Sequence, residues 1–159
     1  MSDWFAVIDT AQDERLFPLV QQCASRACLL SGALAPAVAA AAPYLVSVDE
    51  AEPLIGEWRA NGAGRNWGVL CESALSLEGM RKHLRRFLQV MLPDGMIAQF
   101  RFYDPRVLTI YLPTAPADQL AQWFEGVTQF AVEGPEGRQH SFRLRDGVLF
   151  DGDRPAVWR

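Results

Sequence analysis

Residues 101–106 read Arg-Phe-Tyr-Asp-Pro-Arg and combine a strand signal, a helix-start signal and two arginines on either side of an aspartate. The apolar and aromatic residues that lead into this stretch predict a buried strand over 96–103. Asp104 followed by Pro105 predicts a helix start, because aspartate accepts a free backbone N–H at the N-cap and proline needs no acceptor at the next position. We therefore expect the chain to turn from strand to helix here.

The segments before this corner alternate between strand and helix patterns. Short apolar runs closed by polar residues are typical of buried strands, and apolar residues spaced by three and four are typical of helices. The clearest helical stripe runs from Leu77 to Met91 and predicts a helix over 76–91. Strands are expected at 4–9, 44–48 and 67–72, a further apolar run lies at 27–30, and helices are expected at 13–23, 33–42, 49–60 and 118–126.

The segments after residue 127 have strand-like composition. Residues 128–133, 139–145 and 148–151 predict three short strands, and Asp146-Gly147 is a hairpin turn signal between the last two. Together with the alternating segments before them, they predict an α/β fold: a layered sheet with helices packed on it, ending in a short antiparallel β-hairpin.

The chain of 159 residues is long enough for one domain with a buried core. We expect residues 1–130 to form the main α/β domain and residues 131–159 a short C-terminal β extension of the same domain. Residues 107–112 fit a strand by their β-branched content and a helix by the Asp-Pro start before them, and helix is favoured.

The composition is that of a globular protein, with half of the residues hydrophobic and 21% charged. The longest apolar stretch, 33–48, is interrupted by Pro36 and Pro43, so no membrane span is expected. The N-terminus lacks the basic segment of a signal peptide, and three cysteines make no even disulfide framework. We therefore expect reduced thiols and a cytoplasmic location.

The net charge is −4, which disfavours generic nucleic-acid binding, yet residues 76–112 hold six basic and only three acidic residues. Four of these cations lie on the predicted helix over 76–91. The run is typical either of a solvated helix face or of a docking surface for an acidic partner protein, while nucleic acid is disfavoured because no groove-reading motif is present. The four residues are Arg81, Lys82, Arg85 and Arg86.

Catalytic and metal sites have weak signals in this sequence. Cys71 with His83 and an aspartate could form a thiol–imidazole pair, but no spacing supports it. The cysteines and histidines have no zinc-ligand spacing, and the glycines of 61–65 lack the lysine and the serine or threonine of a phosphate-binding loop. We expect no metal and no cofactor.

The charged residues of the corner at 101–106 have two interpretations. Asp104 can cap the helix and pair with Arg101 or Arg106, which makes the cluster structural. Alternatively the two arginines face a partner, since arginine is enriched at protein interfaces. A small cytosolic enzyme that uses Cys71 or the Arg101–Asp104–Arg106 cluster is the alternative function.

Several pieces of the chain, taken in order, carry a family resemblance. The most specific piece is Arg-Phe-Tyr-Asp-Pro-Arg-Val-Leu at 101–108, and the resemblance covers about residues 4–130. The chain resembles the type VI secretion adaptor family, also called Tap or TEC effector chaperones and known as domain of unknown function 4123. The other pieces are 5–9, 42–46, 67–68, 84–87 and 92–95.

The resemblance implies a bacterial, cytoplasmic, non-enzymatic protein without a cofactor. Such an adaptor binds a toxic effector and helps load it onto the VgrG spike protein. The structural signature would then be Tyr103, Asp104 and Pro105. The residues expected to contact a partner are the cations of the basic helix and of the corner: Arg81, Lys82, Arg85, Arg86, Arg101 and Arg106.

Overall fold

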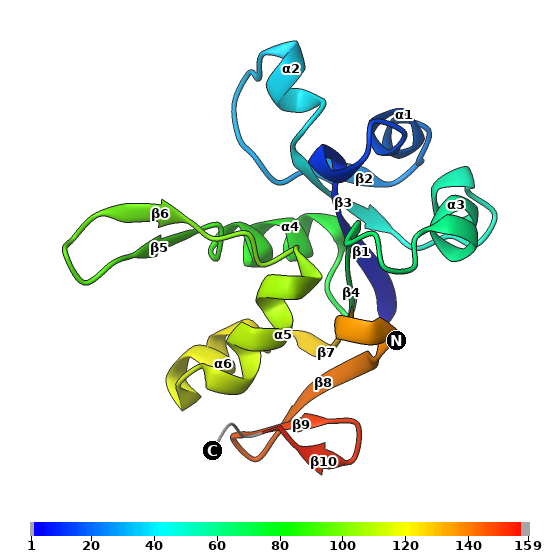
Figure 1. Ribbon diagram of the computed structural model, residues 1–159. Coiled ribbons are helices and arrows are strands. Elements are labelled where there is room, and N and C mark those ends of the chain that lie inside the picture. The colour runs from blue at the N-terminus through cyan, green and yellow to red at the C-terminus, as the bar shows by residue number, and fades with distance from the viewer. Residues whose placement is uncertain (1, 157–159) are drawn as a thin grey trace.

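The computed structural model describes residues 2–156, which contain six α-helices, two single turns of 3-10 helix and ten strands (Figure 1). The strands are β1 (Asp3–Asp9), β2 (Arg26–Cys28), β3 (Pro43–Ser47), β4 (Gly68–Ser73), β5 (Gln89–Met91), β6 (Ile97–Gln99), β7 (Val127–Glu133), β8 (Gln139–Arg145), β9 (Val148–Asp151) and β10 (Arg154–Pro155). The helices are α1 (Leu16–Gln21), α2 (Pro36–Ala39), α3 (Pro53–Asn61), α4 (Leu77–Arg85), α5 (Pro105–Thr114) and α6 (Ala117–Trp123).

Eight of these strands form one sheet, and β5 and β6 form a separate hairpin. The strand order is β10-β9-β8-β7-β4-β1-β3-β2, and every pairing in it is antiparallel. The described chain ends in β9 and β10, and β8 and β9 pair around the predicted turn at 146–147. The predicted fold class, a layered sheet with helices packed on it and an antiparallel hairpin at the end, is confirmed.

Strand β1 is buried on both of its faces and separates two cores. Side chains alternate along a strand, so Phe5 and Val7 enter one core while Ala6 and Ile8 enter the other. The first core contains apolar residues of α4, α5 and α6, and the second contains residues of α1 and α3. The sheet is therefore sandwiched between helices only near β1 and β3, because α1 and α3 are confined to that end (Figure 1).

An aromatic cluster forms the centre of the larger core. The Trp123 ring stacks on Phe87 with centroids 3.9 Å apart, and it meets Phe102 edge-on at 5.3 Å and Phe130 at 6.0 Å. Such pairs add about 0.5–1.5 kcal/mol each beyond the burial of their area. Trp123 thus ties α6 to the turn after α4, to the segment before α5 and to β7.

The helix predicted over 76–91 is wrong in its second half. Helix α4 ends at Arg85, and residues 89–91 form strand β5. Leu88 and Met91 fit a helical stripe, but Leu88, Val90 and Leu92 also alternate with period two, which suits a strand. The turn at 93–95 decides between the two patterns, because Gly95 adopts φ +84° and the Asp94 carboxylate accepts the Met96 N–H.

The buried strand predicted over 96–103 is also wrong. Only Ile97–Gln99 form a strand, this strand is largely exposed, and it pairs with β5 alone. Residues 101–104 form a turn that precedes α5. The preference for helix over 107–112 is confirmed, since α5 runs through this segment. The alanine-rich tract forms only the four-residue helix α2.

Gly68 offers a test of how closely β4 approaches β1. A Cβ at this position would lie 2.0 Å from the Val7 carbonyl oxygen, whereas a Cβ at Gly56 in α3 would meet nothing within 4 Å. We expect Gly68→Ala to lower the free energy of unfolding by about 1–3 kcal/mol, and Gly56→Ala to raise it by about 0.5–1 kcal/mol. Urea unfolding at constant m-value measures both, and equal effects of the two variants would contradict the close approach.

Candidate functional site

The Asp104 carboxylate holds the start of α5. Its Oδ1 accepts the backbone N–H of Arg106 at 2.9 Å, and the Arg106 guanidinium donates to the same carboxylate from Nε at 3.0 Å and from Nη2 at 2.7 Å. Burial, the largest single influence, acts to raise the pKa of Asp104, but the hydrogen bonds from the Arg106 side chain and backbone outweigh it and lower the pKa. The predicted helix cap is confirmed, and Arg106 takes part in it.

Arg101 joins this corner to the end of the central strand. Its Nη2 donates to Oδ2 of Asp9, whose side chain is 1% exposed. The same carboxylate accepts the Ala11 N–H at 3.2 Å and the Gln12 side-chain amide at 2.9 Å. Asp9 and Arg101 are 92 residues apart in sequence, and no local pattern signals their pairing.

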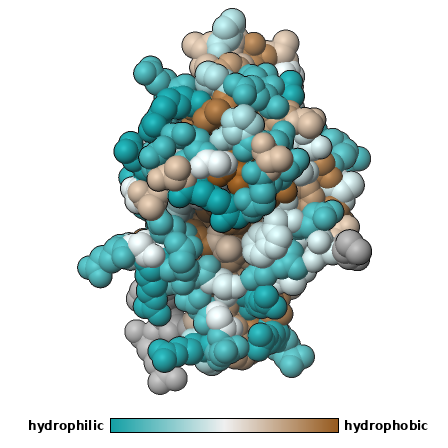
Figure 2. All heavy atoms as spheres, turned by 90° about the vertical axis from the view of Figure 1, so that its right-hand side faces the viewer, coloured by the Kyte–Doolittle hydropathy of each residue, from teal (hydrophilic) through white to brown (hydrophobic). Residues whose placement is uncertain are grey.

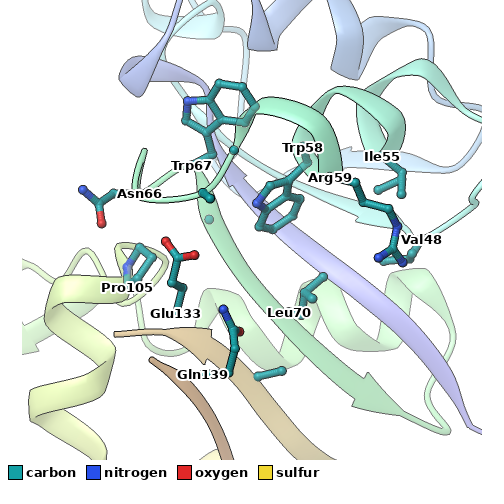
Figure 3. Close-up of a pocket in the computed structure, with 14 residues that line it drawn as sticks. Val48, Ile55, Trp58, Arg59, Asn66, Trp67, Leu70, Pro105, Glu133 and Gln139 are labelled. Carbon is teal, nitrogen blue, oxygen red and sulfur yellow. The ribbon is translucent and has the colours of Figure 1, made fainter. Parts of the chain in front are cut away.

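A cleft of about 260 Å³ lies next to the corner, on the side of the sheet that carries α3 (Figure 3). Its apolar lining includes Trp58 from α3, Leu70 from β4 and Pro105 from the corner. Glu133 and Gln139 point into it from the two strands β7 and β8 (Figure 3). Figure 2, which views the molecule from this side, shows apolar surface recessed between hydrophilic side chains.

The loop between α3 and β4 shapes the upper wall of the cleft. Gly64 and Asn66 have φ angles of +73° and +58°, in the left-handed region that glycine and asparagine adopt most readily. The Gly64 N–H donates to Oε1 of Glu133 at 2.6 Å and so connects the loop to β7. Helix α3 ends at Asn61 with Gly62 as its C-cap, within one residue of the end of the helix predicted over 49–60.

Polar side chains continue from the cleft across the uncovered part of the sheet. The Gln129 amide donates to Oε2 of Glu72 at 2.5 Å, and the Ser141 hydroxyl donates to Oε1 of Gln129 at 2.5 Å. The three residues come from β7, β4 and β8, so their hydrogen bonds run across neighbouring strands. Sequence reasoning found neither this chain of hydrogen bonds nor the cleft, because both depend on which sheet face the helices leave open.

The basic residues of α4 differ in how far the fold uses them. Arg81 donates from Nε to the Cys28 carbonyl at 2.9 Å and lies 3.6 Å from Glu78. Arg86 lies 3.5 Å from a Glu125 carboxylate oxygen. Within residues 2–156, Lys82 and Arg85 make no ion pair. The structure therefore separates cations engaged in the fold from cations that remain available.

Cys71 lies inside the core rather than in a cleft. It is 0% exposed, and burial raises the pKa of its thiol to about 12. His83 is also buried, its Nε2 lies 2.9 Å from the Trp123 carbonyl oxygen, and burial lowers its pKa. An accessible thiolate, which the thiol-enzyme hypothesis requires, is therefore not present at Cys71.

Among the described residues, no three histidine, cysteine, aspartate or glutamate side chains converge so that they could hold a metal ion. Across residues 2–156, none of the helices combines the length and the apolar character needed to cross a bilayer.

Comparison with protein families gives one match. A family model described as "Domain of unknown function (DUF4123)" matches residues 4–122, which include the corner, α4 and the β5–β6 hairpin. No curated protein and no solved structure matches. The match confirms the family to which the sequence resemblance pointed.

Removal of the Arg101 guanidinium should lower the free energy of unfolding more than removal of the Arg106 guanidinium. Arg101→Met leaves the buried carboxylate without its cation, so we expect a loss of about 2 kcal/mol, below the full cost of a buried pair because Arg101 is half exposed. The control Arg106→Met keeps its backbone hydrogen bond to Asp104 and should lose less than about 1 kcal/mol.

A double variant separates this ion pair from general packing. Arg101→Met leaves the Asp9 charge buried without a partner, and adding Asp9→Asn removes that charge. The double variant should therefore lose less free energy of unfolding than the sum of the two single losses. Urea unfolding of the four proteins gives the coupling energy. Strict additivity would show that the ion pair does not hold the corner.

Proposed function

The chain belongs to the DUF4123 family, and from this premise we propose that it is a type VI secretion adaptor. In this role it binds a toxic effector in the bacterial cytoplasm and helps load it onto the VgrG spike protein. The proposal takes the partners from the sequence resemblance, since the description of the family names neither function nor partner. No cofactor is proposed.

The observation that supports this role best is the cleft beside the signature corner. Its floor is apolar and its rim is polar, which suits the capture of an apolar side chain from a partner protein. Pro105 of the most specific family segment forms part of its wall. The residues that define the family therefore also shape a surface that a partner can enter.

The basic residues form the second part of the proposed contact. Arg81, Lys82, Arg85, Arg86, Arg101 and Arg106 remain our candidates for partner binding. Lys82 and Arg85 are expected to contribute most, because the guanidinium groups of Arg81, Arg101 and Arg106 already bond within the fold. Opposite charge across an interface mainly accelerates association and improves specificity.

Affinity capture tests the adaptor role directly. The tagged chain is expressed in its source bacterium, purified after mild cross-linking, and its partners are identified by mass spectrometry. We expect a toxin-bearing effector and the VgrG spike to co-purify with it. Recovery of the folded chain with neither protein would reject the proposed function.

Charge reversal on α4 should weaken this capture without unfolding the protein. Lys82→Glu combined with Arg85→Glu changes two cations that make no ion pair within residues 2–156, so we expect about tenfold weaker effector binding and a smaller dependence on salt. The control Arg138→Glu with Arg154→Glu applies the same charge change to exposed residues at the other end of the sheet. If both pairs reduce binding equally, the effect comes from net charge and not from α4.

A charge on the cleft floor should block a partner that enters the cleft. Leu70→Glu places a carboxylate among apolar side chains, and we expect at least about tenfold weaker capture because an apolar partner group would then have to desolvate it. Val148→Glu makes the same kind of change at an exposed position of β9 and serves as the control. Thermal unfolding confirms that both variants fold, and normal capture by folded Leu70→Glu would exclude the cleft.

A further inference from the structure

The β5–β6 hairpin projects from the body of the molecule as an arm, which Figure 1 shows extending away from the sheet. The arm comprises residues 89–99. An isolated two-stranded hairpin is marginally stable in water, and a cluster of exposed apolar side chains marks an interaction surface. Large exposed apolar residues are concentrated on it: Val90, Met91, Leu92, Met96 and Ile97, with Met91 76% exposed.

The hydrogen-bond pattern of the arm leaves backbone groups free at its edges. Leu88 pairs with Phe100 and Leu92 with Met96 through backbone bonds of 2.8 Å. Hydrogen-bonded and non-hydrogen-bonded pairs alternate in an antiparallel ladder, so Gln89 and Met91 direct their N–H and C=O groups outward. Within residues 2–156 no other strand pairs with this edge, which leaves it open to an added strand.

The side chains of the arm favour an extended occupant over a helical one. Side chains alternate between the two faces along each strand, and residues opposite each other on neighbouring strands share a face. Val90, Leu92 and Met96 therefore lie on one face of the arm, and Met91 and Ile97 lie on the other. A helix laid on the arm would cover only one face. An added strand alternates its own side chains between both faces and can extend both apolar surfaces.

A groove selects the β5 edge rather than the β6 edge. Residues 89–91 border a groove of about 370 Å³, and α6 forms the opposite wall with Gln119 and Gln122. Aromatic side chains of the larger core form its floor, among them Phe100 and Trp123. A segment paired with β5 would therefore lie between the arm and α6, with part of its surface removed from water.

Charge near the groove defines the chemistry of the occupant. Helix α4 ends where the arm begins, and its Lys82 and Arg85 make no ion pair in the described part of the chain. Arg86 lines the groove itself and lies 3.5 Å from a Glu125 carboxylate oxygen, and Asp118 is the one carboxylate among the described lining residues, so Lys82 and Arg85 at the nearby end of α4 are the unpaired cations that favour an acidic occupant. On the arm the only acid is Asp94, which caps the turn, so a second copy of the chain would supply little negative charge.

We propose that the β5 edge binds an extended segment of a partner protein as a third strand of the arm. This segment is apolar on both faces and carries acidic residues at the end that lies next to α4. This inference deepens the proposed function. The identification of the partner as the effector rests on that function. The arm thereby becomes the effector-capturing part of the adaptor.

Three fluorescein-labelled peptides test the chemistry of the segment by fluorescence anisotropy. The first has a short core of valine and isoleucine with glutamates at both ends. The second replaces the glutamates by lysines. The third keeps the glutamates and carries prolines in the core. We expect the acidic strand-forming peptide to bind at least about tenfold tighter than the other two. Equal binding of the proline peptide would overturn strand addition, and equal binding of the lysine peptide would overturn the acidic preference.

Matched proline variants test the edge. Met91→Pro and Ile97→Pro each remove one outward backbone N–H, on β5 and on β6, and neither removes a bond of the hairpin itself. Met91→Pro should weaken binding of the acidic peptide at least about tenfold, while Ile97→Pro should change it less than about twofold. If both variants bind the acidic peptide more weakly, or if neither does, the assignment to β5 is overturned. Circular dichroism verifies that both variants fold.

The same variants separate this inference from the proposed function. If the wild-type chain captures effector and spike but Met91→Pro captures them equally well, the arm assignment fails and the adaptor role stands. If the wild type captures neither partner yet binds the acidic peptide through β5, the adaptor role fails and the edge site stands. A wild-type dimer that Met91→Pro converts to a monomer, seen by sedimentation, would identify a second copy as the occupant and overturn the acidic partner.

Discussion

The ion pair between the buried Asp9 carboxylate and Arg101 joins the corner at 101–106 to the end of the central strand. Asp9 ends the central strand β1, where both sheet faces are already filled, so its charge cannot be hydrated. A buried charge requires a partner and hydrogen bonds, and Arg101 supplies the cation from a distant part of the chain. The turn before α5 is therefore held against the end of β1. Pro105, which directly follows this turn, forms part of the wall of the cleft.

Much of the fold could be predicted because its signals are local. The apolar run of β1 and the Asp-Pro start of α5 each depend on a few adjacent residues, and both were found. The prediction for residues 86–100 was wrong because their apolar residues fit both the helical period and the strand period. A turn whose glycine has a positive φ places these residues in a hairpin. The strand order, with β7 beside β4 across more than fifty residues, has no local signal at all.

The candidate site was less accessible from sequence than the fold. An arginine looks the same in sequence whether it pairs inside the protein or faces a partner. Arg101 and Arg106 bond to aspartates of the fold, while Lys82 and Arg85 make no ion pair in the described part of the chain, and only the tertiary structure separates the two groups. Leu70 is similar: its apolar neighbours predict a buried strand, and its place in an open cleft follows from α1 and α3 covering only one end of the sheet.

The two proposed binding surfaces belong to opposite faces of the sheet. The cleft lies on the face that carries α3, whereas the arm follows α4, which packs on the other face (Figure 1). In the proposed role, the protein contacts two partners, an effector and a spike protein. In our proposals, one surface accepts a side chain in a preformed hollow and the other accepts a strand at an open edge, so the two proposed sites recognise different features of a partner. Because the two surfaces lie on opposite faces of the sheet, the proposed model allows both to be occupied at the same time.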